Sequence, residues 1–458
     1  MKFAPLSWCA LIAALPCLVH ANLELRQQVA DAVGHASERW DSVVRTRLTT
    51  QETFVAYTNE AGVWRTQSDS VWTSGFAPGA FWYLWSLTDN PTWADRAARW
   101  DAGVRSRATA TDNDTGFQIY CAFGTALLVN GDVDESDYTS VIVQGAQTLA
   151  NQRWNPTIGA FRAWPAEANN PTATPFEVNI DMMMNMEIML WAAENGGNPL
   201  WADAAISHAD MSWTDLVRDD HSTFHVVDYN LDGTVDSKRT HQGWTRDSTW
   251  TRGQAWAVYG YTMLYRYTEL PRMLERAEQT FDYYLEQTAL QSDDYVPYSD
   301  FDAPIDSRNP RDSSASAIVA SAALELYMIT GEAKYRTAAE NILNTLTQPP
   351  YLTKGTSYES AMALGSEKWG EGEVGTMTGD YYLIEALWRY TNWIPQDELE
   401  AWRGYDVLEG YWSPTGDFLR LLYILNDPWV YSPRVKNWIY LPEENMHDEG
   451  AWIYLPRP

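Results

Sequence analysis

Cysteine is nearly absent from this chain, since its 458 residues include three, Cys9, Cys17 and Cys121. Two of them lie in an N-terminal segment in which Lys2 precedes an apolar run that ends in small residues, the pattern of a secretory signal peptide. We therefore expect residues 1–21 to be removed and the protein to be secreted, or periplasmic if it comes from a Gram-negative bacterium. Because Cys121 would then stand alone, a disulfide framework is excluded and packing must hold the fold.

Positive charge is also scarce, since 32 Lys and Arg face 61 Asp and Glu, for a net charge of -29. Such a field repels nucleic acid and anionic membranes, so neither is an expected partner. After the N-terminal segment no run approaches the ~20 apolar residues that cross a bilayer. A small anionic ligand remains compatible with the composition, because physiological salt screens distant charges beyond about 8 Å. The oligomeric state is left open.

Histidine is sparse and scattered, and no His-Glu-x-x-His or paired-cysteine pattern occurs, so we expect neither a metal nor another cofactor. One segment, residues 228–233, matches the start of a calcium loop. However, Arg239 stands where the loop needs its bidentate Glu.

An internal repeat organises the chain. Each copy has a bulky residue followed four positions later by Ala, and begins just after a Pro or Gly that starts a helix. A more hydrophobic helical stretch precedes each copy, so the unit is an apolar helix, a tight turn and an amphipathic helix. The copies are Trp93/Ala97, Trp201/Ala205, Met273/Ala277 and Tyr335/Ala339.

Extending this rule predicts six apolar and six amphipathic helices. The apolar ones are expected at 77–88, 117–129, 182–195, 253–268, 315–329 and 379–391, and three amphipathic ones at 23–46, 135–152 and 332–347, with the others after Pro91, Pro199 and Pro271. Alternation of buried and half-buried helices predicts an all-α (α/α)6 barrel, a six-hairpin toroid, over residues 22–393. A solenoid is the alternative, but the spacing of the repeats is too irregular for it. A small β-hairpin insertion is expected at 222–242, and residues 394–458 form a C-terminal extension without an assigned role.

In such a barrel the N-termini of the inner helices gather at one mouth, where free amides and helix dipoles favour an anion. The residues at or just before these starts are mostly polar or aromatic, which suits an acidic sugar, although any single Asp could simply cap its helix. They are Trp72, Asp114, Asp181, Arg252, Trp256, Asp312, Ser313 and Asp380.

Asp181 and Asp114 are the candidate acid and base. Asp181 precedes three methionines, whose apolar surroundings are expected to raise its pKa and keep it protonated. Asp114 is expected to add like-charge repulsion that raises that pKa further.

Two motifs carry a family resemblance. Thr240-His-Gln-Gly243 and Ser248-Thr-Trp-Thr-Arg-Gly-Gln-Ala-Trp256 resemble the signature of the unsaturated glucuronyl hydrolases, glycoside hydrolase family 88. The Arg-Gly-Gln-Ala-Trp run differs from what the related unsaturated rhamnogalacturonyl hydrolases show. Further matching segments are 72–76, 181–185, 311–317 and 379–382.

The resemblance implies removal of a 4,5-unsaturated uronic acid from the non-reducing end of lyase-generated oligosaccharides. Asp181 would protonate C4 of the double bond and activate a water that adds at C5, with assistance from Asp114. Asn113 stands where many members have His, so one substrate contact differs. The resemblance further implies substrate-binding roles for Trp72, Asn113, Trp164, His225, Gln242, Arg252 and Trp256.

Other functions fit parts of the pattern. An inverting glycosidase on the same barrel also needs two carboxylates, and an unsaturated rhamnogalacturonyl hydrolase would share the fold. A polysaccharide lyase would need a Tyr or His base in an open cleft. A secreted sugar-binding protein would need the aromatics but not the acid pair. The leaving sugar is left open.

Overall fold

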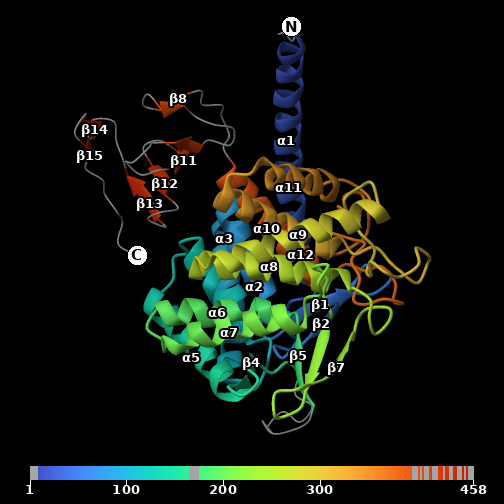
Figure 1. The fold of residues 1–458 in the computed structure, drawn as a ribbon. Helices are drawn as coiled ribbons and strands as arrows, with labels where there is room; N and C mark the ends of the chain where they lie inside the picture. The colour runs from blue at the N-terminus through green and yellow to red at the C-terminus, as the bar shows by residue number, and fades with distance from the viewer. Residues whose placement is uncertain are drawn as a thin grey trace, which may run out of the picture.

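The computed structural model describes residues 9–164 and 175–394, together with short strands between 401 and 451. Helices dominate the fold and form two sets (Figure 1). The first set is α2 (Phe76–Thr88), the π-helix η2 (Gly116–Gly124) continued by α4 (Thr125–Leu128), α6 (Met182–Glu194), α8 (Thr251–Thr268), α10 (Ser313–Thr330) and α12 (Met377–Trp393). The second is α1 (Cys9–Thr46), α3 (Pro91–Val104), α5 (Glu135–Arg153), α7 (Leu200–Asp215), α9 (Pro271–Gln291) and α11 (Ala333–Leu346), with a 3-10 turn η1 (Arg105–Thr109) after α3.

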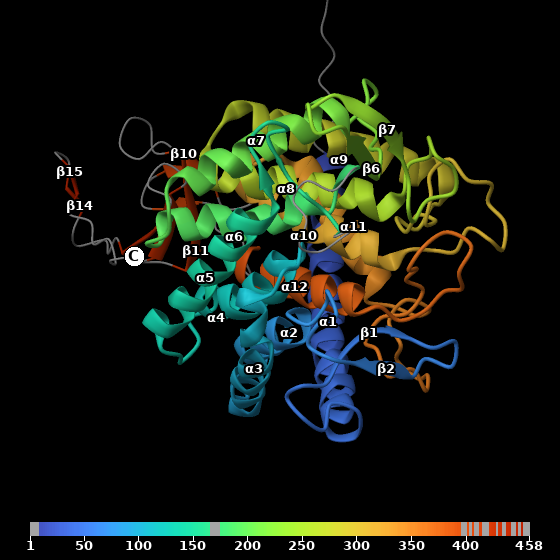
Figure 2. The same cartoon turned by 90° about the horizontal axis from the view of Figure 1, so that it is seen from below.

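The first set closes into a ring. Packing runs from α2 to η2, α6, α8, α10 and α12, and α12 returns to α2. Most members also pack on the helix that follows them, α2 on α3, α6 on α7, α8 on α9 and α10 on α11. Viewed from below, α8, α10 and α12 lie in the middle while α3 and α7 lie at opposite edges (Figure 2). The predicted (α/α)6 barrel is confirmed.

Burial separates the two helix sets as their sequences require. Every residue of α10 from 313 to 327 is buried, whereas α9 buries one stripe at helical spacing, from Met273 and Ala277 to Tyr284. Among the described residues α10 is the one helix long and apolar enough to cross a membrane, but 83% of it is buried inside the barrel. The strong hydrophobicity of α10 therefore serves the core.

The inner-to-outer turns share one backbone device. Asp89, Glu269 and Gly331 each follow an inner helix in the left-handed conformation, with φ of 52, 51 and 71°. The amide of each donates back to the helix that it ends. This geometry reverses the chain within a few residues, and in two cases a proline then starts the outer helix.

The predicted β-hairpin is present as β6 (Val226–Tyr229) and β7 (Val235–Arg239), but it belongs to a three-stranded antiparallel sheet. The missed strand is β5 (Phe176–Asn179), which pairs with β6 and leads directly into α6. Arg239, the residue that breaks the calcium pattern, pairs with Asp228 and Glu177 across this sheet.

Other short strands were not predicted. The hairpins β1 (Phe54–Thr58)/β2 (Trp64–Gln67) and β3 (Trp154–Asn155)/β4 (Ala160–Phe161) decorate the barrel. Beyond residue 394 the described strands are β8 (Ala401–Trp402), β9 (Tyr405–Asp406), β10 (Trp412–Pro414), β11 (Leu421–Asn426), β12 (Trp429–Ser432), β13 (Asn437–Tyr440), β14 (Met446–His447) and β15 (Gly450–Ala451).

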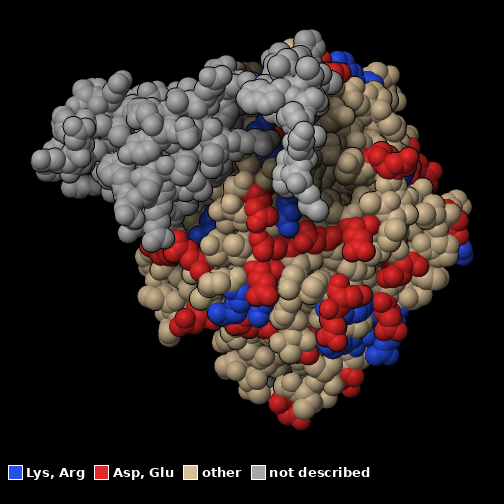
Figure 3. Space-filling model, turned by 45° about the horizontal axis from the view of Figure 1, so that its top comes forward, with Lys and Arg blue, Asp and Glu red and all other residues tan. Residues whose placement is uncertain are grey.

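Two features concern the chain as a whole. Helix α1 begins at Cys9, within the predicted signal peptide, and residues 1–8 lie outside the described residues, so removal of residues 1–21 stays a prediction. Asp and Glu side chains are spread over the face seen in Figure 3, in keeping with the net charge of -29.

Candidate active site

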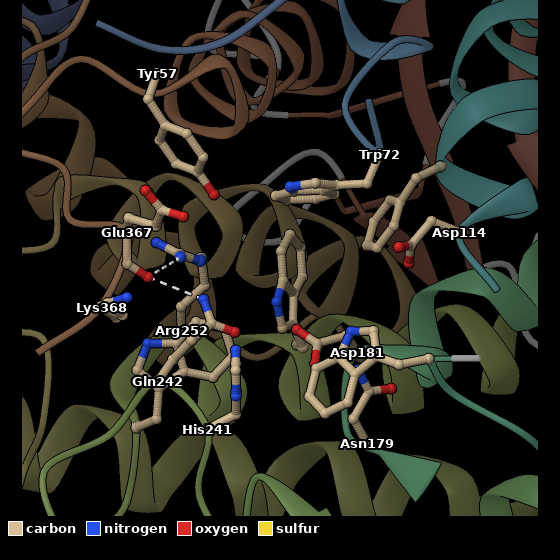
Figure 4. Close-up of a pocket in the computed structure, with 14 residues that line it drawn as sticks. Tyr57, Trp72, Asp114, Asn179, Asp181, His241, Gln242, Arg252, Glu367 and Lys368 are labelled. Carbon is tan, nitrogen blue, oxygen red and sulfur yellow. Dashed lines mark hydrogen bonds between the residues drawn. The ribbon is translucent and has the colours of Figure 1, made fainter. Parts of the chain in front are cut away.

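A pocket of about 180 Å³ opens where the inner helices begin. It contains seven of the nine predicted site residues, namely Trp72, Asp114, Trp164, Asp181, Gln242, Arg252 and Trp256 (Figure 4). Asn113 and His225 are buried at 2% and 1% exposure and do not line the pocket. Sequence reasoning assigned no role to the remaining lining residues, Tyr57, Phe117, Asn179, His241, Trp250, Glu367 and Lys368.

Asp181 occupies the N-cap position of α6 without capping it. The side-chain oxygen of Asn179, at the end of β5, instead accepts the Met182 amide at 3.3 Å. The Asp181 carboxyl is therefore free to face the pocket, where 15% of its side chain is exposed. The following methionines, Met182 and Met183, are fully buried in the barrel core.

His225 lies behind Asp181, with its Nε2 atom 3.3 Å from Asp181 Oδ2. The backbone amides of His241 and Gln242 donate to His225 Nδ1 at 3.2 and 3.3 Å. Because Nδ1 is an acceptor, the ring proton of the neutral imidazole is on Nε2, on the side of the Asp181 carboxyl, although the two groups are not aligned as a hydrogen bond. Stacking on Trp250, at 4.5 Å between ring centroids, fixes the ring plane. His225 therefore lies directly behind the Asp181 carboxyl.

Asp114 lies just before the π-helix and is anchored by Asn185 of α6. The Asn185 amide donates to Asp114 Oδ1 at 3.3 Å, and its carbonyl accepts the Phe117 amide at 3.0 Å. Helix η2 must approach α6 closely for this, since a Cβ on Gly116 would lie 2.7 Å from Asn185 Cα. A π-helix at such a point is typical of functional sites.

Burial raises the pKa of Asp114 well above its ordinary value, and the charges of Asp112 and Asp181 raise it further. The like-charge interaction expected between the two aspartates is therefore present at Asp114. Asp114 sits in the wall between η2 and α6, whereas the methionines that follow Asp181 point into the core.

Arg252 is engaged by the protein. Its Nη1 donates to Asp312 Oδ2 at 3.0 Å and to the Ser366 carbonyl, and Nη2 donates to the Glu367 carbonyl at 2.9 Å. The bidentate contact with a substrate carboxylate would require these bonds to exchange. In this structure Arg252 positions the loop that carries Glu367 and Lys368.

Two aspartates that were grouped with the mouth do not line the pocket. Asp312 caps α10 by accepting the Ser314 amide and pairs with Arg252. Asp380 accepts the amides of Ala361 and Met362 at 2.8 and 2.9 Å. Both therefore hold the loop before α12 in place.

Aromatic rings shape the pocket. Trp72 and Trp256 contact Phe117 at 5.4 and 5.3 Å between centroids, and Trp164 lies 5.0 Å from His241. Trp72 and Trp164 are partly exposed, whereas Trp256 is 1% exposed and lies in the core. The two exposed indoles offer faces on which a sugar ring can stack.

Tyr57, Glu367 and Lys368 close the pocket opposite the aspartates (Figure 4). Tyr57 comes from the unpredicted strand β1, and the others come from the loop before α12. Burial raises the pKa of both the Tyr57 phenol and the Glu367 carboxyl. Lys368 Nζ lies 2.9 Å from Glu371. No helix periodicity pointed to these residues.

Comparison with known proteins identifies the family. The model of Glycosyl Hydrolase Family 88 matches residues 42–384. The chain belongs to glycoside hydrolase family 88. It is 40% identical to an unsaturated glucuronyl hydrolase of Formosa agariphila over 70% of this chain and 80% of that protein, and 30% identical to the Bacillus sp. GL1 enzyme of that name over 69% and 85%. The crystal structure of an unsaturated glucuronyl hydrolase specific for heparin superposes with a TM-score of 0.73 at 32% identity, covering 80% of this chain and 97% of that one.

Proposed function

We propose that this glycoside hydrolase removes a 4,5-unsaturated uronic acid from the non-reducing end of oligosaccharides that polysaccharide lyases release. The observation that carries the proposal is the Asp181 carboxyl, which does not cap its helix and faces a small aromatic pocket with His225 Nε2 3.3 Å behind it. Family membership supports the same activity, since the relatives named above are unsaturated glucuronyl hydrolases.

The reaction begins with the protonated carboxyl of Asp181, which gives its proton to C4 of the C4=C5 double bond. A water oxygen bonds to C5, and the proton that this water loses restores Asp181. The product is a hemiketal at C5. Opening of its ring produces a ketone at C5 and a hemiacetal at C1, which collapses to an aldehyde and releases the remaining sugar with its oxygen.

The neighbouring residues support this step. His225 Nε2 lies 3.3 Å from Asp181 Oδ2, so a small shift of either side chain would let it donate to the Asp181 carboxylate that exists between the two proton transfers. Burial raises the pKa of Asp114 and so favours its protonated form, which can donate a hydrogen bond to a sugar hydroxyl without adding negative charge to a pocket for an anion. Trp72 and Trp164 stack on the sugar, and the amides at the helix starts favour its carboxylate.

The test is loss of the ultraviolet absorbance of the double bond when the purified protein is incubated with a panel of lyase-made disaccharides. Asp181→Asn removes the exchangeable proton at constant size, so absorbance loss is expected to stop while the circular dichroism spectrum stays unchanged. Asp203→Asn, the same change at an exposed site on outer helix α7, is the matched control and is expected to remain fully active.

Three outcomes contradict the proposal. Cleavage of saturated glycosides would indicate an inverting glycosidase, and binding without turnover would indicate a sugar-binding protein. Turnover by Asp181→Asn at the wild-type rate would show that Asp181 is not the proton donor. Within the panel, the disaccharide with the highest kcat/KM identifies the leaving sugar, including a rhamnose if the enzyme acts as an unsaturated rhamnogalacturonyl hydrolase.

We also propose that the enzyme is exported. The charged Lys2, the apolar run after it and the small residues up to Ala21 support cleavage after residue 21. Mass spectrometry of the protein recovered outside the cytoplasm is expected to show Asn22 at the N-terminus, whereas an intact Met1 in that fraction would contradict cleavage.

A further inference from the structure

A second and larger cavity, of about 910 Å³, opens at the opposite end of the barrel. Residues from all six inner helices line it, among them Glu194 at the end of α6 and Trp393 at the end of α12. Phe117 borders this cavity as well as the catalytic pocket. Tyr382, which also lines the second cavity, packs on Trp256 of the catalytic pocket at 5.4 Å between centroids. A thin layer of aromatic side chains therefore separates the two.

Charged side chains lie deep in this cavity. Glu325 accepts hydrogen bonds from Arg266 at 2.7 Å and from Arg389 at 2.8 Å, so it is shared by both guanidinium groups. Glu385 accepts from two tyrosine hydroxyls at 3.0 Å each, and lies 3.7 Å from Arg389. With Glu187, the deep cavity lining contains three carboxylates for two guanidinium groups.

Glu187 is the carboxylate best placed to meet a ligand. It is 16% exposed, and the hydrogen bonds that it accepts within the described part of the chain, from Arg266 and Tyr267, both reach Oε1. Burial raises its pKa, and the charges of Glu325 and Glu385 add to this effect while the charge of Arg266 opposes it. A cationic group beside Oε2 would relieve that unfavourable burial of negative charge.

The outer part of the cavity is also acidic. Glu135, Glu194 and Glu269 line it and are exposed. The inner helices end here, and the partial negative charge of their C-termini adds to the same field. Both effects disfavour an anionic ligand such as the uronate of the opposite mouth.

Two further features indicate a saccharide rather than a simple amine. Trp191, Trp388 and Trp393 line the cavity, and indole faces are the usual surface for a sugar ring. In addition, Nε of the buried Arg389 has no hydrogen-bond partner among the described residues, although Arg389 lines the cavity. An unpaired buried donor is costly, and a ligand hydroxyl oxygen would satisfy it.

We propose that this second cavity binds an amino sugar. Its ammonium group lies at Glu187, its ring stacks on an indole of the wall, and a hydroxyl oxygen accepts the proton of Arg389 Nε. The acidic rim attracts the ligand, and the aromatic layer around Phe117 keeps it apart from the substrate of the catalytic pocket.

Isothermal titration calorimetry of the full-length protein at low ionic strength tests this with matched probes. The disaccharide of glucosamine is expected to bind at one site, and its N-acetylated counterpart, which has the same rings without the charge, to bind at least tenfold more weakly. Glu187→Gln and Trp191→Ala are each expected to weaken the glucosamine disaccharide about tenfold, which corresponds to ~1.4 kcal/mol. Asp181→Asn, in the other mouth, is expected to leave this affinity unchanged.

Glu286→Gln on the exposed face of α9 is the matched control, since it removes the same charge away from the cavity. Equal losses in Glu187→Gln and Glu286→Gln would show diffuse attraction to the acidic surface seen in Figure 3, and would overturn the proposal. The proposal would also be overturned if the acetylated probe bound as tightly as the glucosamine disaccharide. A third contradicting result would be spermidine binding as tightly as the disaccharide, with an affinity that Trp191→Ala does not change. If Glu187→Gln fails to fold, Glu194→Gln at the exposed rim decides the question, because an unchanged affinity there contradicts the proposed field.

Discussion

Asp101 carries a buried charge that the fold would be more stable without. It lies on α3 at 1% exposure, and its Oδ2 atom accepts hydrogen bonds from Trp82 of α2 at 2.8 Å and Tyr138 of α5 at 2.9 Å. Its Oδ1 atom has no partner among the described residues. Burial raises the pKa of Asp101 from 3.8 to about 7, since these two hydrogen bonds only partly offset the loss of hydration.

The effect on stability follows from proton linkage. Below pH 3.8 the folded and unfolded states both bind the proton, so the group adds no pH dependence. Between 3.8 and about 7 the unfolded state releases a proton that the folded state retains, and the free energy of unfolding falls by about 1.4 kcal/mol for each pH unit. Above pH 7 the accumulated loss is therefore about 4 kcal/mol.

Asp101→Asn removes this loss while keeping the hydrogen bonds, because the amide oxygen can accept both donors and the new NH2 group replaces the unpartnered Oδ1. The difference in unfolding free energy between variant and wild type is expected to grow in the variant's favour by about 4 kcal/mol from pH 4 to pH 8. Urea unfolding at several pH values measures it, and other titrating groups cancel in the difference.

Asp380 is the matched comparison. Burial raises its pKa to about 7 as well, but its two oxygens each accept a backbone amide, from Ala361 and Met362. In Asp380→Asn the new NH2 group faces one of these backbone N–H groups, so two donors oppose each other and the fold is expected to be less stable at every pH. A constant difference between Asp101→Asn and wild type from pH 4 to pH 8, or stabilisation by both variants alike, would refute the reasoning.

Three further variants probe the catalytic mouth. Arg252→Met leaves the buried Asp312 carboxylate without its cation and is expected to lower the free energy of unfolding in urea by about 3–5 kcal/mol. Adding Asp312→Asn is expected to restore part of this loss, and a loss within experimental error would contradict the reasoning. Tyr57→Phe removes a hydroxyl from the pocket wall and is expected to raise KM about tenfold with little change in stability, as steady-state kinetics would show. Asn179→Ala removes the side chain that caps α6 and is expected to lower the free energy of unfolding by about 1 kcal/mol. It is also expected to lower kcat, because Asp181 can then turn to cap the helix; an unchanged kcat would contradict this.

The barrel could be predicted because its information is local. Pro91 and Pro271 start outer helices, and the turn residues before them leave the preceding helix in a left-handed conformation. Inner and outer helices differ in how many of their faces are apolar, and this difference can be seen in the sequence of each segment by itself. The predicted ends of the inner helices consequently fall within about two residues of the observed ones.

The missed parts depend on distant contacts. Strand β5 exists because β6 pairs with it across about 50 residues of chain. The π-helix at Gly116 depends on Asn185 of the next inner helix, which no window around residue 116 contains. The loop with Glu367 is held by Arg252 and Asp380, so its place in the pocket could not be deduced from the loop itself.

The surroundings of the two catalytic aspartates also depend on distant contacts. The methionines after Asp181 are close in sequence, but they point into the core while the carboxyl faces the pocket. The groups that act on Asp114 include Asp112, two residues away, and Asp181, which is brought near by the packing of η2 on α6. Sequence neighbours identify which residues are acidic, whereas the groups that surround each carboxyl depend on which face of the helix start it occupies.

A parallel ring of inner helices also imposes a difference between its two ends. The amides at the helix starts favour the anionic uronate at the catalytic mouth, and the carbonyls at the helix ends favour a cation at the opposite mouth. The side chains add to this difference, because six Glu and two Arg line the second mouth, whereas three carboxylates, one Arg and one Lys line the catalytic pocket. Since Phe117 borders both cavities and its amide is held by the residue that anchors Asp114, a ligand in the second cavity would act on the same π-helix that positions a catalytic carboxyl. The amino-sugar titrations therefore also measure whether the two mouths are coupled: saturation of one would shift the affinity of the other by an equal factor.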